Sequence, residues 1–265
     1  MKVYVTGASG VIGRALREFL PQGVFLDRYA LDVTDTARFD IQMRTAVVNN
    51  GPPSAIIHAA AVTDHATPDI RRLIDVNVCG TARVASWAGA HGVPLVFLST
   101  HYVYPGIRGR YREGDALQPI GAYAMSKFAG EQWARSVPNA LVIRGSWYTP
   151  ESRLDAWANT GAFNDAWVSR ESSRDAARKI AALTLAERWG VFNIGGPRRT
   201  FAQILRDEGY TDFPEGSRRF ATSTYPFPED VSVDTGKFDR WERAQAAPPA
   251  QLSLALEAAE PAATH

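Results

Sequence analysis

The sequence contains a single cysteine, Cys79, among its 265 residues. One cysteine excludes an intrachain disulfide and any cysteine-rich metal site, and we predict no metal centre. An excess of charge of either sign is also missing, because 29 lysines and arginines are balanced by 28 acidic residues. Without a basic stripe, the chain is not expected to bind nucleic acid.

Long hydrophobic runs are absent as well. No apolar stretch approaches the roughly 20 residues that cross a bilayer. No signal peptide precedes Lys2-Val3-Tyr4-Val5, which already has the pattern of a strand. We therefore expect a cytoplasmic protein that does not bind membranes. Hydrophobic residues nevertheless make up 45% of the chain, which is enough to bury a sizeable core.

Short apolar runs alternate with amphipathic stretches along most of the chain. The apolar runs predict strands at 3–6, 24–26, 55–59, 95–99, 141–144 and 191–194. The amphipathic stretches predict helices at 11–20, 36–48, 69–90, 123–136 and 173–187, and a short one at 201–208. This alternation is typical of an α/β fold with a mostly parallel sheet covered by helices on both faces.

A glycine motif follows the first strand and opens the first helix. Gly7 permits a tight turn, Gly10 lets the backbone approach a pyrophosphate, and Gly13 allows close packing of helix on strand. The motif predicts a Rossmann-type dinucleotide site. Asp27, at the end of the second strand, favours NAD through the ribose hydroxyls, whereas Arg28 favours the 2′-phosphate of NADP. The choice between NADP and NAD stays open.

Two segments interrupt the alternation and predict a second, smaller region. Ligands of open α/β sheets bind beyond the carboxyl ends of the strands, and both segments follow such ends. We therefore expect a doubly wound NAD(P)-binding domain and a small substrate-binding cap, followed by a C-terminal helix or tail. The predicted boundaries are 1–148 and 172–197 for the NAD(P)-binding domain, 149–171 and 198–243 for the cap, and 244–265 for the tail.

The reactive centre is predicted from three residues. Tyr123 and Lys127 lie four apart and share one helix face. There, a nearby ammonium favours the phenolate and lowers the pKa of a phenol from about 10. Ser99 and Thr100 end a buried strand and bring hydroxyls to the same edge of the sheet. Thr100 and Tyr123 would hydrogen-bond one substrate oxygen while the phenol transfers a proton.

These motifs resemble those of the extended short-chain dehydrogenase/reductase family. Within it, the chain is similar to the dTDP-4-dehydrorhamnose reductase branch, through Ser99-Thr-His-Tyr-Val-Tyr-Pro-Gly106 and Tyr123-Ala-Met-Ser-Lys-Phe-Ala-Gly-Glu131. The resemblance implies that Thr100, Tyr123 and Lys127 are catalytic and that Asn77 supports the proton relay. The glycine motif and the resemblance together imply these cofactor contacts: Gly7, Ser9, Gly10, Val11, Ile12, Gly13, Asp27, Arg28, Asp32, Val33, Ala59, Ala60, Ala61, Asn77, Ser99, Tyr123 and Lys127.

The substrate side departs from the family pattern. His101 replaces the acidic residue that usually follows the catalytic threonine, and Tyr225 stands where an arginine is common. We interpret His101 as an imidazole outside the reacting groups, with a substrate-facing general acid as the alternative. The predicted substrate contacts are Thr100, His101, Tyr102, Trp147 and Arg218.

Three functions remain open on the sequence. The first is an NAD(P)H-dependent reductase of the 4-keto group of a nucleotide-activated, dTDP-type deoxysugar. The second is a nucleotide-sugar epimerase that retains NAD. The third is an NAD(P)-binding regulatory subunit without turnover, since a fold alone does not prove activity. The resemblance also implies a homodimer that pairs the helices at 69–90 and 123–136, where Phe128 and Trp133 would suit the contact.

Overall fold

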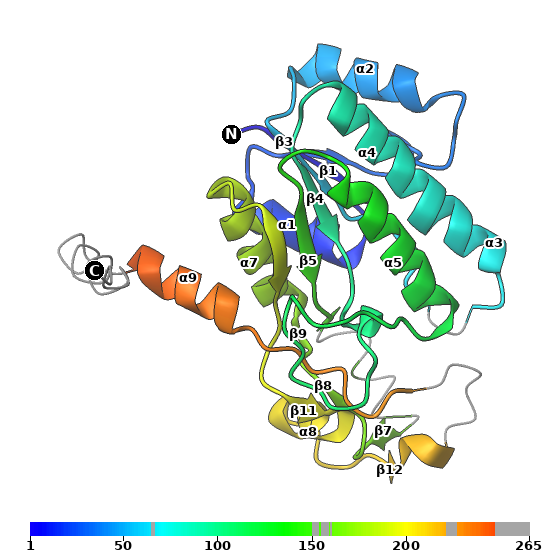
Figure 1. Cartoon of the computed structure of the whole chain (residues 1–265), viewed down its shortest axis with the longest axis vertical. Helices are drawn as coiled ribbons and strands as arrows, with labels where there is room; N and C mark the ends of the chain where they lie inside the picture. The colour runs from blue at the N-terminus through cyan, green and yellow to red at the C-terminus, as the bar shows by residue number, and fades with distance from the viewer. Residues whose placement is uncertain (65–66, 150–153, 155–158, 160, 221–226, 247–265) are drawn as a thin grey trace, which may run out of the picture.

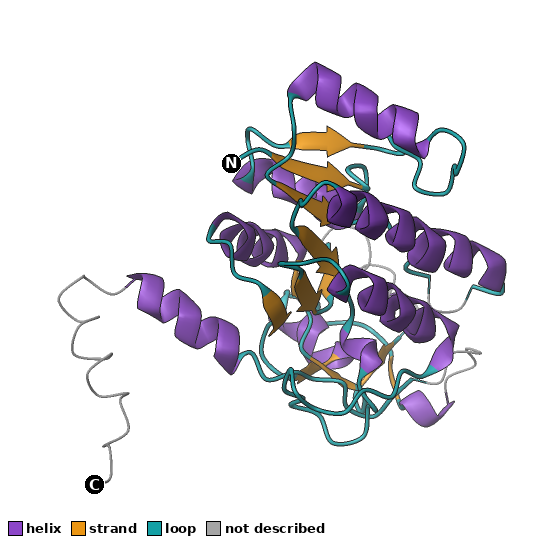
Figure 2. Ribbon diagram, turned by 45° about the horizontal axis from the view of Figure 1, so that its top comes forward, coloured by secondary structure: helices purple, strands orange, loops and turns teal. Residues whose placement is uncertain are grey.

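The central element of this computed structural model is a six-stranded parallel sheet (Figures 1 and 2). The structure describes residues 1–64, 67–149, 154, 159, 161–220 and 227–246. The strand order is β10-β5-β4-β3-β1-β2, and all five neighbouring pairs run parallel. The strands are β1 (Val3–Thr6), β2 (Val24–Leu26), β3 (Ala55–His58), β4 (Leu95–Leu98), β5 (Leu141–Arg144) and β10 (Gly190–Asn193). The predicted α/β fold is confirmed.

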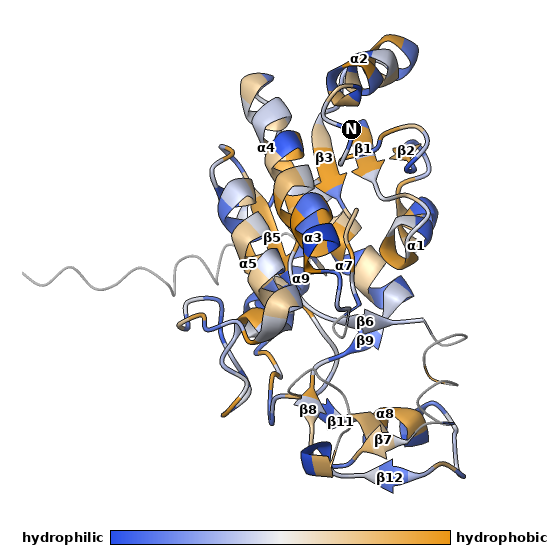
Figure 3. Cartoon of the chain, turned by 90° about the vertical axis from the view of Figure 1, so that its right-hand side faces the viewer, coloured by the Kyte–Doolittle hydropathy of each residue, from blue (hydrophilic) through white to orange (hydrophobic). Residues whose placement is uncertain are grey.

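Side chains alternate between the two faces of the sheet, which explains the apolar runs. Val3 and Val5 pack in one buried cluster with helices α1 and α7, whereas Tyr4 packs in the other with α2 and α4. Because both faces are covered, these strands are mostly apolar, as the hydropathy colouring of Figure 3 shows. The polar exceptions stand at the carboxyl ends of four strands and are Thr6, His58, Arg144 and Asn193. The helices are α1 (Val11–Phe19), α2 (Phe39–Asn50), α4 (Thr81–Ala90), α5 (Gly121–Arg135) and α7 (Ser173–Leu185).

The helix predicted at 69–90 differs from the structure. It consists of α3 (Ile70–Leu73), a π-helical segment (Ile74–Gly80) and α4. Asn77 lies in the π-helical segment, and its side chain bonds both backbone groups of Val62, at 2.8 and 3.0 Å. Apolar periodicity cannot reveal such a local widening, which often marks a functional site.

The sheet order reverses between β1 and β3, because the chain moves outward to β2 and then returns to the other side of β1. Ligands of doubly wound sheets bind beyond the carboxyl ends of the strands at this reversal. None of the described helices is long and apolar enough to cross a membrane.

Short strand pairs and one helix gather beyond the end of the sheet (Figure 3). The pairs are β6 (Trp147–Tyr148) with β9 (Glu171–Ser172), β7 (Ala162–Phe163) with β12 (Glu215–Gly216), and β8 (Trp167–Val168) with β11 (Arg199–Thr200), and the helix is α8 (Phe201–Asp207). The last helix, α9 (Gly236–Ala246), runs past the predicted boundary at 243, and its Phe238 packs in the core of the sheet domain. Most of the predicted C-terminal tail lies outside the described residues.

Candidate active site

The loop between β1 and α1 is shaped by its glycines. Gly7 has φ +66°, and a Cβ there would lie 2.5 Å from the backbone nitrogen of Ala60. A Cβ on Gly13 would lie 2.4 Å from the carbonyl oxygen of Gly7. Within the described residues no side chain caps α1 at Gly10, so its first N–H groups face a potential ligand. This loop therefore fits a dinucleotide pyrophosphate, which such helix ends bind.

A groove beside this loop suits the adenosine half of a dinucleotide. Arg28 lines it, and the Nε atom of Arg28 lies 3.1 Å from Oδ2 of Asp32. Asp27 is not among the described residues that line the groove, and its carboxylate accepts hydrogen bonds from the backbone of Tyr29 and Ala30. The groove is lined also by Gly7, Ser9, Gly10, Val33, Ala59, Ala60 and Ala61.

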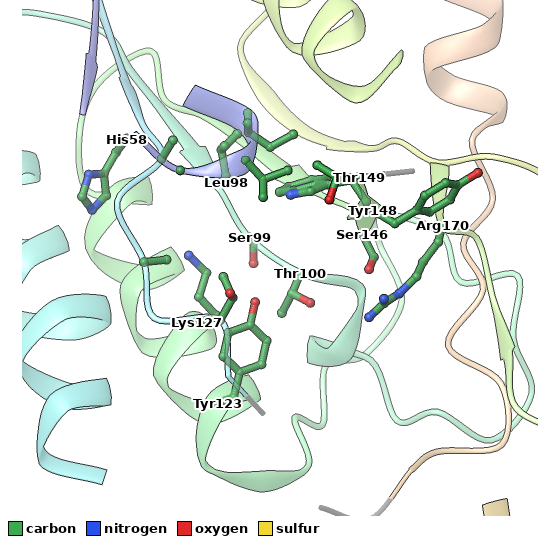
Figure 4. A pocket seen from close by; sticks show the side chains of 18 residues that line it. His58, Leu98, Ser99, Thr100, Tyr123, Lys127, Ser146, Tyr148, Thr149 and Arg170 are labelled. Atoms are coloured by element: carbon green, nitrogen blue, oxygen red, sulfur yellow. The ribbon is translucent and has the colours of Figure 1, made fainter. Parts of the chain in front are cut away.

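A second cavity continues from this groove, since Gly10, Ala59 and Ala61 line both. Thr100 enters it from the end of β4, and Tyr123 and Lys127 enter it from α5 (Figure 4). Val11, Ile12, Ser99 and Trp147 line it as well. One cavity therefore contains both the residues predicted to contact the nicotinamide end of the cofactor and the residues predicted to form the reactive centre.

Lys127 is deeply buried beside this cavity. Its side chain is 3% exposed, and its Nζ lies 4.2 Å from the centre of the Phe97 ring. Burial lowers the pKa of Lys127 to about 7, although the charge of Glu131 opposes this shift. Burial therefore makes the ammonium of Lys127 easier to deprotonate than that of an exposed lysine.

The two hydroxyls at the end of β4 have different partners. Ser99 donates to Oε2 of Glu131 at 2.9 Å. Thr100 accepts from the backbone N–H of Tyr102 at 3.3 Å, which leaves its own proton to donate elsewhere. Thr100 is thus suited to bind a substrate oxygen in the cavity.

His58 lies in a buried hydrogen-bond chain behind Lys127. Thr81 donates to the backbone oxygen of Asn77, so its hydroxyl oxygen accepts from His58 Nε2 at 3.1 Å. The other ring nitrogen, Nδ1, then accepts from the hydroxyl of Thr6 at 2.7 Å. This arrangement requires the neutral imidazole. It also links the ends of β1 and β3 to α4, which begins at Thr81.

Loss of stability in acid is expected from His58. Burial, with the charge of Lys127, lowers its pKa to about 3, whereas the unfolded chain binds the proton near about 6.5. The unfolded state therefore binds more protons below that pH, and His58 lowers the unfolding free energy as pH falls, by up to about 1.4 kcal/mol per pH unit. In denaturant titrations at decreasing pH, the unfolding free energy of His58→Gln should fall less steeply than that of the parent chain. Equal slopes would contradict this prediction.

Sequence reasoning missed one charged residue of the cavity, Arg170. It is 4% exposed, and its guanidinium points into the cavity in Figure 4 and lies 5.2 Å from the Phe201 ring. Arg170 lies just before β9 in a polar segment without a recognisable sequence motif, so its role in the cavity could not be predicted. Ser146, Tyr148 and Thr149 also line the cavity without having been predicted.

Several predicted residues lie away from the described cavity lining. The Arg218 guanidinium bonds Glu229 at 2.8 Å within the cap. His101 is fully buried, with its ring edge-on to Tyr102, and neither is among the described lining residues. Asn77 instead joins the 59–62 loop to α5 through Val62 and Ser126. Tyr225 lies outside the described residues.

A parallel sheet with its glycine loop at the reversal, and Thr100, Tyr123 and Lys127 in the adjoining cavity, define a protein of the Rossmann-type, dinucleotide-binding fold class. The model of the RmlD substrate binding domain family matches residues 1–184. The chain is 36% identical over 219 residues to a dTDP-4-dehydrorhamnose reductase of Streptomyces griseus, covering 72% of this chain and 70% of the relative. The chain belongs to the RmlD substrate binding domain family.

Other relatives match over shorter stretches. A dTDP-4-dehydrorhamnose reductase of Aggregatibacter actinomycetemcomitans is 31% identical over 150 residues, which is 55% of this chain and about half (51%) of the relative. The beta subunit of methionine adenosyltransferase 2 of Danio rerio is 32% identical over 155 residues, covering 54% of this chain and 46% of the relative. Family membership therefore does not by itself distinguish an enzyme from a subunit.

Solved structures share the fold over nearly the whole chain. A dTDP-4-dehydrorhamnose reductase of Bacillus anthracis in complex with NADP has a TM-score of 0.80 at 22% identity, covering 90% of this chain and 92% of that one. A UDP-glucose 4-epimerase of Thermus thermophilus in complex with NAD has a TM-score of 0.73 at 21% identity, covering 91% and 93%. Neighbours of this fold thus bind either NADP or NAD.

Proposed function

We propose that the protein is an NAD(P)H-dependent reductase of the 4-keto group of a nucleotide-activated, dTDP-type deoxysugar. The observation that carries the proposal is the single cavity that Thr100, Tyr123 and Lys127 line next to the dinucleotide groove. The names of relatives that match most of the chain supply the substrate class.

The proposed chemistry divides between three side chains. The cofactor, when bound, supplies the hydride. Thr100 donates a hydrogen bond to the ketone oxygen and orients it, and Tyr123 gives that oxygen its proton. Lys127 lowers the pKa of the phenol through its charge and holds the nicotinamide ribose. All three line one cavity, where Thr100 and Tyr123 would face the ketone oxygen and Lys127 the phenol and the ribose.

The remaining predicted residues belong to this proposal. We assign the glycine loop, the Ala59–Ala61 run and Arg28 to cofactor binding, and the cap at 149–171 and 198–243 to substrate binding. A homodimer through α3–α4 and α5 is proposed as well. On α5, Trp133 is 47% exposed, whereas Phe128 packs partly against the chain's own core.

Arg170 is proposed to bind an anionic group of the substrate, such as its diphosphate. We expect Arg170→Met to raise KM for the nucleotide sugar at least about tenfold, because a hydrogen bond to a charged group is worth about 1.5 to 3 kcal/mol. The Kd for NADPH should change little. The matched control is Arg178→Met, which removes a guanidinium bonded to Glu242 outside the cap. Equal KM values for both variants would contradict this role.

Steady-state turnover tests the proposed function. Oxidation of NADH and of NADPH is followed by absorbance, with freshly generated dTDP-4-keto-6-deoxyhexose as the substrate. We expect cofactor oxidation that depends on the sugar. Faster oxidation of NADH would show that Asp27 determines the cofactor preference, and faster oxidation of NADPH that Arg28 does. Cofactor binding without any turnover would contradict the proposal.

Two other functions each have a supporting observation. An epimerase that retains NAD is supported by the same three side chains and by the epimerase fold neighbour. A regulatory subunit is supported by the similarity to the beta subunit of methionine adenosyltransferase 2. Cofactor that stays bound through dialysis would favour the epimerase. The reductase is preferred because the more extensive matches are to reductases.

A further inference from the structure

Glu131 is a carboxylate with no exposed surface, and it takes part in a buried network beside the reactive centre. Its Oε1 pairs with Nη2 of Arg144 at 2.5 Å, and its Oε2 accepts from Nε of Arg144 at 3.2 Å. The same Oε2 accepts from Ser99 at 2.9 Å. Arg144, which is 1% exposed, also bonds the hydroxyl of Tyr104 at 3.0 Å. Such fully bonded networks hold their members in one arrangement.

This carboxylate shares a helix face with two of the predicted catalytic residues and bonds the sequence neighbour of the third. It lies one turn beyond Lys127 and two turns beyond Tyr123 on α5, so the three share one helix face. Through Ser99 it also holds the residue next to Thr100 on the neighbouring strand. Glu131 therefore links α5 to the end of β4.

The charges around Lys127 are few and of both signs. Glu131 favours the ammonium, while burial opposes it, and the pKa of Lys127 is about 7. His58 faces Lys127 from β3 and is neutral, and Arg144 faces Glu131 from β5. Arg135, half exposed, has its Nη1 atom 3.8 Å from Oε1 of Glu131. Glu131 thus pairs directly with Arg144 and Arg135 and acts on Lys127, one helical turn away, through the field of its charge.

We propose that Glu131 is a positioning residue of the reactive centre, whose carboxylate is the counter-ion that keeps Lys127 charged and anchors Ser99 beside Thr100. This proposal rests on the proposed function only for the role that it gives to Lys127. Loss of the carboxylate leaves the Arg144 charge uncompensated, so the Lys127 ammonium is disfavoured twice. Loss of the Arg144 charge has the opposite effect, because one neighbouring cation is removed while the carboxylate stays.

The ionisation of Lys127 can be measured directly by NMR, since the sequence has only four lysines, Lys2, Lys127, Lys179 and Lys237. The side-chain carbon signals are followed against pH on the full chain without cofactor or substrate, and Lys127→Met assigns the resonance. We expect Glu131→Gln to move the Lys127 midpoint down by about one pH unit or more. Arg144→Gln should move it up.

Opposite shifts separate a charge effect from simple damage, because both variants disrupt the Glu131–Arg144 pair. The matched control is Glu171→Gln, which neutralises another buried carboxylate, paired with Lys179 at 2.6 Å. It should leave the Lys127 midpoint unchanged. If Glu131→Gln does not fold, the upward shift in Arg144→Gln decides. Shifts in the same direction, or no shift, would overturn the proposal. Because no turnover is measured, the outcome is independent of whether the protein is a reductase.

Discussion

Tyr123→Phe is expected to lower kcat by about a thousandfold or more while changing the Kd for NADPH by less than about twofold. A positioned proton donor contributes about 10²- to 10⁴-fold to a rate, and the variant removes the donor but keeps the ring. Tyr123 is 6% exposed and lines the cavity, so its ring continues to fill the same space. Turnover by absorbance and cofactor binding by fluorescence measure the two quantities separately.

Tyr148 provides the matched control, because it is a second phenol in the same cavity. Its hydroxyl bonds Glu208 at 2.5 Å, and burial raises its pKa to about 12, so it is a poor proton donor at neutral pH. Tyr148→Phe should therefore reduce kcat far less. An equal loss in both variants would show that the cavity requires phenols for its shape and would remove Tyr123 from the chemistry.

Gly7→Ala is expected to lower the unfolding free energy by about 2 to 4 kcal/mol and to abolish measurable cofactor binding. The residue has φ +66°, where an alanine is strained by about 1 kcal/mol. The added Cβ would also lie 2.5 Å from the backbone nitrogen of Ala60, and crowding of this kind costs about 1 to 3 kcal/mol. Relief requires the loop to move away from β3, which displaces the pyrophosphate-binding backbone. Thermal unfolding and a titration with NADPH measure the two effects.

Gly89→Ala is the control for this substitution. Gly89 lies in α4, and apart from its chain neighbours and the nearby backbone of that helix no atom lies within 4 Å of the added Cβ. The change should therefore stabilise the helix by up to about 1 kcal/mol. Cofactor binding should be unaffected. If Gly7→Ala behaves like Gly89→Ala, the close approach at the glycine loop has no energetic consequence.

The sheet could be predicted from the sequence because burial on both faces makes each strand a mostly apolar run. All six strands were predicted at their positions, within a residue at each end. The glycine loop could also be predicted from the sequence. Gly7 has a positive φ and a close backbone contact, and few residues other than glycine tolerate both. Spacing on one helix face also placed Tyr123 and Lys127 together.

Part of the cavity lining could not be predicted, because it depends on contacts between distant segments. Arg170 enters the cavity from a polar loop without periodicity, while Arg218 is held by Glu229. The π-helical segment around Asn77 depends on a side-chain bond to Val62, which lies 15 residues away. The Glu131–Arg144 pair likewise becomes visible only when α5 packs on β5.

Deuterium transfer tests the central claim most directly. The protein is incubated with dTDP-4-keto-6-deoxyhexose and with NADH or NADPH that carries deuterium at the transferring position. The account predicts a sugar nucleotide with one deuterium at C4 and an equal amount of oxidised cofactor. A sugar product without deuterium, or no reaction despite bound cofactor, would contradict it and would favour the epimerase or the regulatory subunit respectively.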